Sequence, residues 1–420
     1  MFSKTLIKFL CIYLLIFSLI FSQFYYVFAD DTIDENLSTD SFIFESLTSE
    51  SSTSVANEPI VYSKNIIAID RGTNTILFEK NSKEKVPMAS TTKIMTCIIA
   101  LENSNLDEIV TVSKKAASIH GSKLGIKEGM QISMSSLIYG LMLRSGNDCA
   151  IAIAEHICGS VENFCSKMTE KAYSLGLTNT NFTSPHGLDD DNHYTTAYEL
   201  ALITNYALNN ETFRKVVSTH NITILLENSS ISIHNTNELL GNVEGVYGVK
   251  TGFTFNAGRC LVSCCKRDNM DIIVVVLGAD TKALRTKDSI SIINYIFNTY
   301  TLIDTKEKLF SSFNNYCKIY QKTVSIEKST DLPVLELEEN QNYTFPISKK
   351  ELDNIDIKIN CIQKLSYATP INSQIGTISV YNSNKLLYTS NIYLQNSLTK
   401  KGYIYYFKYI FKNYFNFMYI

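Results

Sequence analysis

The sequence has no marked excess of charge, no basic cluster and no Cys-x-x-Cys pair. Its 420 residues carry 38 basic and 41 acidic side chains, for a formal net charge of −3. Because the lysines are scattered along the chain, the sequence predicts no basic patch that could bind a nucleic acid, and we expect no nucleic-acid partner. The absence of a Cys-x-x-Cys pair also disfavours a cysteine-based metal site.

The first 29 residues lack the length of apolar sequence that a typical membrane-spanning helix needs. The apolar run 9–21 follows Lys4 and Lys8 and precedes Val27-Phe28-Ala29, an arrangement typical of a signal peptide that is cleaved after Ala29. We therefore expect residues 1–29 to be a signal peptide; an uncleaved anchor is the alternative, and both predict export. Cleavage removes Cys11 from the ten cysteines, and the odd number that remains excludes a full disulfide framework.

The chain from residue 30 to residue 302 changes from a polar segment to mixed helices and strands. Residues 30–58 are rich in Ser, Thr, Asp and Glu without apolar periodicity, which predicts a flexible spacer. Residues 59–302 read as two strands, a helical block, three strands and a closing helix. This order predicts an α/β (α+β) catalytic domain with an antiparallel sheet flanked by helices. The predicted strands are 65–70, 75–79, 245–251, 259–266 and 271–278, and the predicted helices are 90–101, 134–143, 148–158, 195–208 and 289–298.

The C-terminal third has a different pattern. Residues 309–395 contain short alternating stretches such as 377–381 and 385–389 around an Asn-Ser-Asn turn, which predicts a second, small all-β domain. Residues 400–420 place Lys408, Lys412 and Asn416 on one helical face and aromatic or aliphatic residues elsewhere. This pattern predicts an amphipathic helix that lies in a membrane interface. A spanning helix and a helix packed on the protein are the alternatives.

Three short motifs carry the chemistry. Ser90-Thr91-Thr92-Lys93 places a hydroxyl and an amine three residues apart, on one face of a helix. A lysine whose pKa is lowered, by burial and by a second ammonium group such as that of Lys250, can deprotonate the serine. The same spacing occurs at four other places, but only Ser90 follows a proline that marks a helix entry. The other four pairs are Ser82–Lys85, Ser263–Lys266, Ser325–Lys328 and Ser397–Lys400.

The other two motifs are Ser145-Gly146-Asn147 and Lys250-Thr251-Gly252. The first places a hydroxyl and a carboxamide in a turn between two helices, and Asn147 as a plain helix cap is the structural alternative. The second ends a strand, where the glycine permits close backbone approach of a ligand. A strand end with a solvated lysine is the alternative there.

The three motifs in this order resemble the set that penicillin-binding proteins and β-lactamases carry. The surrounding stretches 87–96, 181–188, 193–197 and 248–254 are similar to those of the low-molecular-mass penicillin-binding proteins, the serine D-alanyl-D-alanine carboxypeptidases. This resemblance implies an exported hydrolase at the outer face of the cytoplasmic membrane or in the cell wall. It further implies a peptidoglycan pentapeptide ending in D-Ala-D-Ala as substrate, inhibition by β-lactams, membrane contact through the C-terminal helix, and no cofactor or metal.

The resemblance also implies the roles of the site residues. Ser90 is the acylated nucleophile, Lys93 its base, and Ser145 a proton relay to the leaving group. Asn147 binds the substrate amide, while Lys250, Thr251 and Gly252 form the strand that holds its carboxylate end. The backbone N–H groups of Ser90 and Phe253 form the oxyanion hole.

Several alternatives remain open at this stage. A β-lactamase would need a glutamate in a Glu-x-x-Leu-Asn stretch, and the only lookalike begins at Glu238 with glycine in place of leucine. A wall-binding protein that has lost turnover is the other alternative, although every motif residue is intact. The family often has a carboxylate-binding arginine where this chain has Asp280, and Arg285 is the candidate replacement. His186, His193 and the aspartates between them suggest a metal site only weakly.

Overall fold

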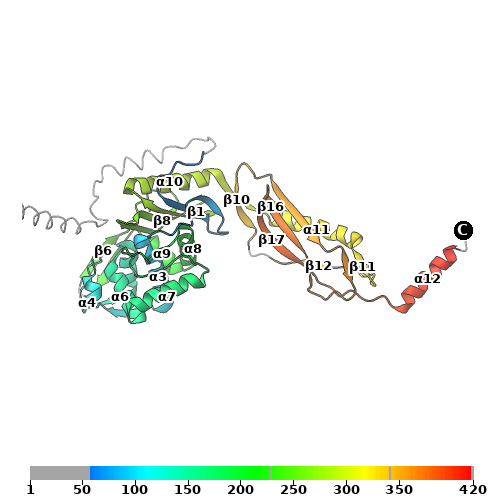
Figure 1. The fold of residues 1–420 in the computed structure, drawn as a ribbon, viewed down its shortest axis with the longest axis horizontal. Coiled ribbons are helices and arrows are strands. Elements are labelled where there is room, and N and C mark those ends of the chain that lie inside the picture. The colour runs from blue at the N-terminus through cyan, green and yellow to red at the C-terminus, as the bar shows by residue number, and fades with distance from the viewer. Residues whose placement is uncertain (1–56, 228, 340–341, 418–420) are drawn as a thin grey trace, which may run out of the picture. The chain divides into compact units, whose positions relative to one another are not determined.

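The computed structural model describes residues 57–227, 229–339 and 342–417, and the chain divides into two compact units, Met1–Asn298 and Thr299–Ile420 (Figure 1). Each unit has a hydrophobic core of its own. The predicted signal peptide (1–29) and all but the last two residues of the predicted spacer (30–58) lie outside the described residues.

The first unit is built on a five-stranded antiparallel sheet with the strand order β2-β1-β9-β8-β7. Successive side chains of β1, Ile66 to Ile69, are all 0% exposed, so both faces of the sheet are covered. Figure 1 shows α10 on one side of the sheet and the other helices of this unit on the opposite side. The strands are β1 (Asn65–Asp70), β2 (Ile76–Lys80), β7 (Val246–Thr254), β8 (Gly258–Arg267) and β9 (Met270–Ala279). Strand β7 forms an edge of this sheet.

Helix α3 (Lys93–Asn103) lies in the middle of the helical block, and its residues from Lys93 to Ala100 are buried. An apolar sequence all around a helix is typical of such a central position. Neighbouring helices begin at side-chain caps, for example Ser133 before α5 and Thr196 before α8. The remaining helices of the unit are η1 (Ala89–Thr92), α4 (Lys114–Ser118), α5 (Met134–Leu143), α6 (Asn147–Cys158), α7 (Val161–Ser174), α8 (Ala197–Ala207), α9 (Glu211–Val217) and α10 (Lys282–Thr299).

The predicted strands and helices of this unit are all present, most of them with shifted ends. Helix α10 begins seven residues before its predicted start at residue 289. Helices α4, α7 and α9 and two small strand pairs were not predicted, although the buried residues Val161, Phe164, Cys165 and Met168 of α7 have helical spacing. The strand pairs are the antiparallel pair β3 (Ile109–Thr111) and β4 (Gln131–Ser133), which α4 separates along the chain, and the hairpin of β5 (Asn221–Leu226) and β6 (Ser229–His234).

The second unit has a four-stranded sheet with the order β12-β17-β16-β14. The predicted turn joins β16 to β17 through Ser383, whose φ of 54° suits the tight hairpin. One element differs from the prediction: residues Lys306–Thr323 form helix α11, which buries Leu309, Phe313 and Tyr320. The strands are β10 (Tyr300–Asp304), β11 (Ser325–Glu327), β12 (Leu335–Leu337), β13 (Thr344–Ser348), β14 (Ile355–Cys361), β15 (Lys364–Ser366), β16 (Gln374–Asn382) and β17 (Lys385–Leu394).

Helix α12 (Tyr403–Phe417) occupies most of the predicted C-terminal helix. Its side chains are exposed as far as they are described, including Ile404, Phe407 and Ile410. The described side chains of this helix therefore do not pack on the rest of the unit. Within the described ranges, no helix is long and apolar enough to cross a membrane.

Candidate active site

Ser90 and Lys93 lie at the turn that begins the central helix. Residues Ala89–Thr92 form the 3-10 turn η1, and α3 continues it from Lys93. The Nζ atom of Lys93 donates a hydrogen bond to the Oγ atom of Ser90 over 2.8 Å, and the lysine is 0% exposed. The predicted contact across three residues is therefore present, and it joins a hydroxyl to an amine that is shielded from water.

The other four Ser-x-x-Lys pairs lie outside helices. Ser263 is on strand β8 and Ser325 begins strand β11, where residues three apart point to opposite faces of the sheet. Ser82 and Ser397 lie in stretches without regular structure. The helical context that the proline at position 87 predicts thus separates Ser90 from the accidental matches.

Lys93 is held by two further acceptors. Its Nζ atom donates to Oδ1 of Asn147 over 2.8 Å and to the backbone oxygen of His186 over 2.9 Å. The amide nitrogen of Asn147 donates in turn to the backbone oxygen of His120 over 2.8 Å. Gly146, and not Asn147, occupies the cap position of α6. The interpretation of Asn147 as a helix cap is therefore wrong, because its side chain binds the lysine instead.

Ser145 has two unusual features. Its φ of 62° lies in the left-handed region, which L-residues with a Cβ atom rarely adopt. Its Oγ atom is buried and has no hydrogen-bond partner among the described residues. An unpaired buried hydroxyl costs about 1–3 kcal/mol, and residues with a strained backbone gather at functional sites.

Strand β7 brings the third motif against the nucleophile turn. A Cβ atom on Gly252 would lie 3.0 Å from the backbone nitrogen of Ser90, so the glycine permits this close approach. The approaching group is the backbone of η1, not the ligand that the motif predicted. Lys250, two residues earlier on the strand, is 1% exposed and donates to the backbone oxygen of Thr251 over 2.9 Å. The alternative of a solvated lysine is therefore wrong.

The loop between Pro185 and His193 packs beneath the nucleophile turn. Gly187 has a φ of 87°, and a Cβ atom there would lie 1.9 Å from the backbone oxygen of Ala89, so only glycine fits. Burial, aided by the charge of Lys93, lowers the pKa of His186 to about 3. Burial also lowers the pKa of His193 to about 4. Both rings are therefore neutral at pH 7.

The two histidines are engaged in hydrogen bonds within the chain. His193 contacts Thr92 and the Thr183 backbone, and Nδ1 of His186 accepts from the backbone of Leu188. Across residues 57–227, 229–339 and 342–417, no group of three His, Cys, Asp or Glu side chains is arranged to hold a metal ion.

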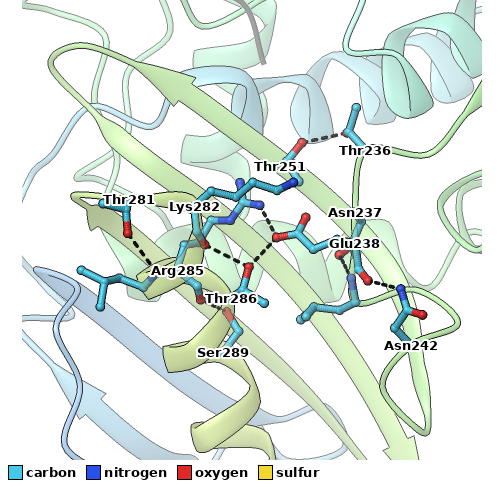
Figure 2. A network of polar contacts seen from close by, with 12 residues as sticks. Thr236, Asn237, Glu238, Asn242, Thr251, Thr281, Lys282, Arg285, Thr286 and Ser289 are labelled. Atoms are coloured by element: carbon cyan, nitrogen blue, oxygen red, sulfur yellow. Dashed lines mark hydrogen bonds and ion pairs between the residues drawn. The ribbon is translucent and has the colours of Figure 1, made fainter. Parts of the chain in front are cut away.

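Figure 2 shows a network behind the motif on β7 that the sequence analysis missed. Arg285 of α10 is 2% exposed and donates from Nη2 to Oε1 of Glu238, which also accepts from Oγ1 of Thr286 over 2.6 Å. The hydroxyl groups of Thr236 and Thr251 lie 2.8 Å apart and connect the same loop to β7. The positive charge of Arg285 lowers the pKa of Glu238 against the effect of its burial.

This ion pair bears on two alternatives that the sequence left open, a β-lactamase base at Glu238 and a substrate-binding role for Arg285. Glu238 is bound to Arg285 and Thr286, so it is not placed as a β-lactamase base. Arg285 has a carboxylate partner within the protein, which the sequence did not indicate because 47 residues separate the two.

Taken together, the geometry favours covalent catalysis. A serine hydroxyl lies against a buried amine, beside an edge strand that carries a second buried lysine. A nucleophile with an adjacent base is the arrangement for acyl transfer, and an edge strand can pair with an extended peptide. Cations around the site favour an anionic substrate.

Comparisons with known proteins agree with this geometry. A family model described as D-alanyl-D-alanine carboxypeptidase matches residues 52–281. The D-alanyl-D-alanine carboxypeptidase DacF of Bacillus subtilis is 32% identical over 353 residues, which cover 81% of this chain and 87% of the relative. A D-alanyl-D-alanine carboxypeptidase of a Streptomyces species, strain K15, is 36% identical over 55% of this chain and 85% of its own length.

Solved structures give the same result. Penicillin-binding protein 5 from Haemophilus influenzae is similar with a TM-score of 0.66 and 25% identity, over 82% of this chain and all of that one. The DD-transpeptidase of Streptomyces K15 is similar with a TM-score of 0.54 and 33% identity, over 57% of this chain and 98% of that one. The matching family model covers more than half of the chain, and the Bacillus relative extends the likeness into the second unit. This protein therefore belongs to the D-alanyl-D-alanine carboxypeptidase family of serine peptidases, within the low-molecular-mass penicillin-binding proteins.

Proposed function

We propose that this protein removes the terminal D-alanine from peptidoglycan stem peptides that end in D-Ala-D-Ala, through an acyl-enzyme on Ser90. The single observation that carries this proposal is the 2.8 Å contact between the Nζ atom of Lys93 and the Oγ atom of Ser90 in a buried setting. β-Lactams present a reactive amide to the same serine, so they acylate it as well.

In the first half of the reaction, the Oγ atom of Ser90 attacks the carbonyl carbon between the two D-alanines. Neutral Lys93 takes the hydroxyl proton as the C–O bond forms. The backbone N–H groups of Ser90 and Phe253 stabilise the negative oxygen, each by a few kcal/mol. Lys93 then returns this proton to the leaving nitrogen through the hydroxyl of Ser145, the C–N bond breaks, and D-alanine departs, which leaves Lys93 neutral again.

In the second half, water attacks the ester carbonyl of the acyl-enzyme. Lys93 accepts a proton from the water and returns one to the Oγ atom of Ser90 as the ester bond breaks. Asn147 binds the peptide amide and orients Lys93, which its Oδ1 atom contacts at 2.8 Å. The products are the shortened peptide acid and free enzyme.

The carboxylate end of the substrate binds at the edge strand. Lys250, Thr251 and Gly252 lie together on β7, beside the Ser90 backbone. Buried Lys250 attracts the terminal carboxylate, and the hydroxyl of Thr251 donates to it. Arg285 and Glu238 form an ion pair behind this strand, and their loop is joined to Thr251 through Thr236.

The Ser90→Ala variant tests the assignment. It is expected to fold but to lose D-alanine release and penicillin acylation, both of which need the nucleophile. Ser325→Ala is the matched control, since Ser325 also precedes a lysine by three residues but begins strand β11 of the second unit. Release of D-alanine by Ser90→Ala at the wild-type rate would refute the mechanism.

We also propose that residues 59–302 form the catalytic domain, residues 309–395 a small accessory domain, and residues 400–420 a membrane anchor, with the protein exported to the outer face of the cytoplasmic membrane. The anchor proposal is supported by exposed apolar side chains on α12, among them Ile404 at 74% and Phe407 at 68%. Lys408 and Lys412 lie one turn apart, which suits a helix at an anionic lipid interface.

Deletion of residues 401–420 tests the anchor. The truncated protein is expected to lose sedimentation with anionic lipid vesicles while it keeps its rate of D-alanine release from a soluble peptide. A second variant, Phe407→Ser with Ile410→Ser, removes apolar surface without shortening the chain. Vesicle binding that survives both changes would contradict the anchor.

A further inference from the structure

His193 was singled out by the sequence, and the proposed reaction does not use it. It lies at the end of the loop beneath the nucleophile turn, is 3% exposed, and packs edge-on against the Phe182 ring at 5.8 Å between centroids. Its Nε2 atom lies 2.7 Å from the Oγ1 atom of Thr92. A buried neutral imidazole needs partners for both nitrogens, and both partners are identified here.

The partners determine the direction of this hydrogen-bond chain. The Nδ1 atom of His193 accepts from the backbone N–H of Thr183 over 3.1 Å, so the ring proton is on Nε2. Nε2–H therefore donates to Oγ1 of Thr92. The Thr92 hydroxyl then donates to the backbone oxygen of Ala89 over 2.8 Å. The chain runs from the His193 loop to the residue before the nucleophile.

The peptide unit between Ala89 and Ser90 needs such support. Ala89 has a φ of 48°, a left-handed conformation that costs an L-residue free energy and persists only when neighbours hold it. Because a trans peptide is planar, the direction of the Ala89 carbonyl fixes the direction of the Ser90 N–H on the opposite side. Gly187 packs on the Ala89 oxygen and Gly252 lies by the Ser90 nitrogen, so the unit is held between two glycines.

We propose that His193 is a positioning residue: through Thr92 it orients the Ala89–Ser90 peptide so that the Ser90 N–H points at the developing oxyanion. This inference rests on the proposed function, since it assigns that N–H to the oxyanion hole. His193 touches neither the substrate nor the reacting atoms. Its effect falls on the acylation step, where an error of about 1 Å in donor placement costs up to 10²-fold in rate.

A double-mutant cycle on the full chain tests the proposal. Thr92→Val removes the hydroxyl and keeps the shape, while His193→Phe keeps a planar ring and removes the donor. Each change is expected to lower the acylation rate constant for a penicillin about 10- to 100-fold, with little change in the non-covalent binding constant. The double variant is expected to be no slower than the slower single variant, because both changes break one chain.

The His193→Gln variant tests whether the hydrogen bond can be restored, because the glutamine amide N–H can replace Nε2–H as donor to Thr92. We expect it to keep acylation within about threefold of wild type. A purely structural role would lower the unfolding temperature and the active fraction instead, so both are measured for every variant. If His193→Phe does not fold, the cycle of Thr92→Val with His193→Gln replaces it, with the expectation that glutamine adds no loss to Thr92→Val.

Three results would overturn the positioning role: multiplicative losses in the cycle, equal losses in the glutamine and phenylalanine variants, or acylation of His193→Phe within twofold of wild type. The proposed function fails by a different result, activity in Ser90→Ala. A chain in which Ser90→Ala is inactive and His193→Phe is fully active keeps the proposed function and loses only this inference.

Discussion

The two units of the chain bury different kinds of polar side chain. Within the described ranges, the first unit buries the basic side chains Lys93, Lys250 and Arg285, at 0%, 1% and 2% exposure. The buried polar side chains of the second unit are uncharged: Thr305, Ser329, Asn382 and Ser390. Burying a charge costs free energy of folding unless hydrogen bonds and partners offset it. The first unit therefore gives up stability to hold reactive groups, whereas the second has the composition of a plain structural core.

The largest effect is expected from removing a buried basic side chain of the first unit. Lys93→Ala is expected to lower the acylation rate for a penicillin about 10³- to 10⁴-fold, because the base that accepts the serine proton is lost. Stopped-flow acylation measures this loss, and the unfolding temperature, measured in parallel, separates it from a loss of folded protein. An acylation rate within tenfold of wild type would assign the base to another residue.

The next prediction compares the loss of a charged partner in the first unit with the loss of an apolar side chain in the second unit. Glu238→Ala leaves Arg285 buried without its carboxylate, so we expect the first unit to lose about 3–5 kcal/mol of stability. Ile378→Ala, at 0% exposure in the second unit, is expected to cost about 2–4 kcal/mol by leaving a cavity. Chemical denaturation measures both losses.

Activity separates the two variants. Glu238→Ala is expected to change D-alanine release even under conditions where it stays folded, because Arg285 lies behind the strand that carries Thr251 (Figure 2). Ile378→Ala is expected to leave that rate within twofold of wild type. If both changes altered the rate of D-alanine release by the folded enzyme equally, the proposed functional difference between the units would be wrong.

A smaller effect follows from the two neutral histidines of the first unit. Burial lowers the pKa of His186 to about 3 and that of His193 to about 4, from the usual 6.5. The unfolded chain therefore binds more protons below pH 6.5, and the stabilisation present at pH 7 is lost as the pH falls toward those values. Between pH 7 and pH 5, each ring is expected to cost the first unit about 2 kcal/mol.

Denaturation of the His193→Gln variant at both pH values isolates one ring. The variant is expected to lose about 2 kcal/mol less than wild type over this interval. An identical loss in variant and wild type would show that His193 does not titrate as its burial implies.

The sequence predicted the elements of the first unit well because its strands and helices follow clear periodicities. Strand β1 has the predicted bounds because its apolar run lies between Asn65 and Asp70, and helix α5 has them because its largely apolar sequence lies between Ser133 and Arg144. Helix α11 was missed because its buried residues, Leu309, Phe313 and Tyr320, are few and lie among charged ones. Helical periodicity can be recognised in a sequence only when many residues of the helix are apolar and buried.

The candidate site was predictable in its motifs and not in its connections. Local spacing gave the contact between Ser90 and Lys93, because residues three apart meet on a helical turn. The bond from Lys93 to Asn147 spans 54 positions, and the pair of Arg285 with Glu238 spans 47, so tertiary packing decides both. The same holds for the contact of His193 with Thr92, which spans 101 positions.

The most direct test of the central claim is to locate the covalent adduct. The purified protein without residues 1–29 is incubated with a labelled penicillin, digested and mapped by mass, while D-alanine release from a D-Ala-D-Ala peptide is measured in parallel. We predict a long-lived adduct on Ser90 together with D-alanine release that the penicillin abolishes. An adduct on another residue, or rapid hydrolysis of the drug without D-alanine release, would contradict the account.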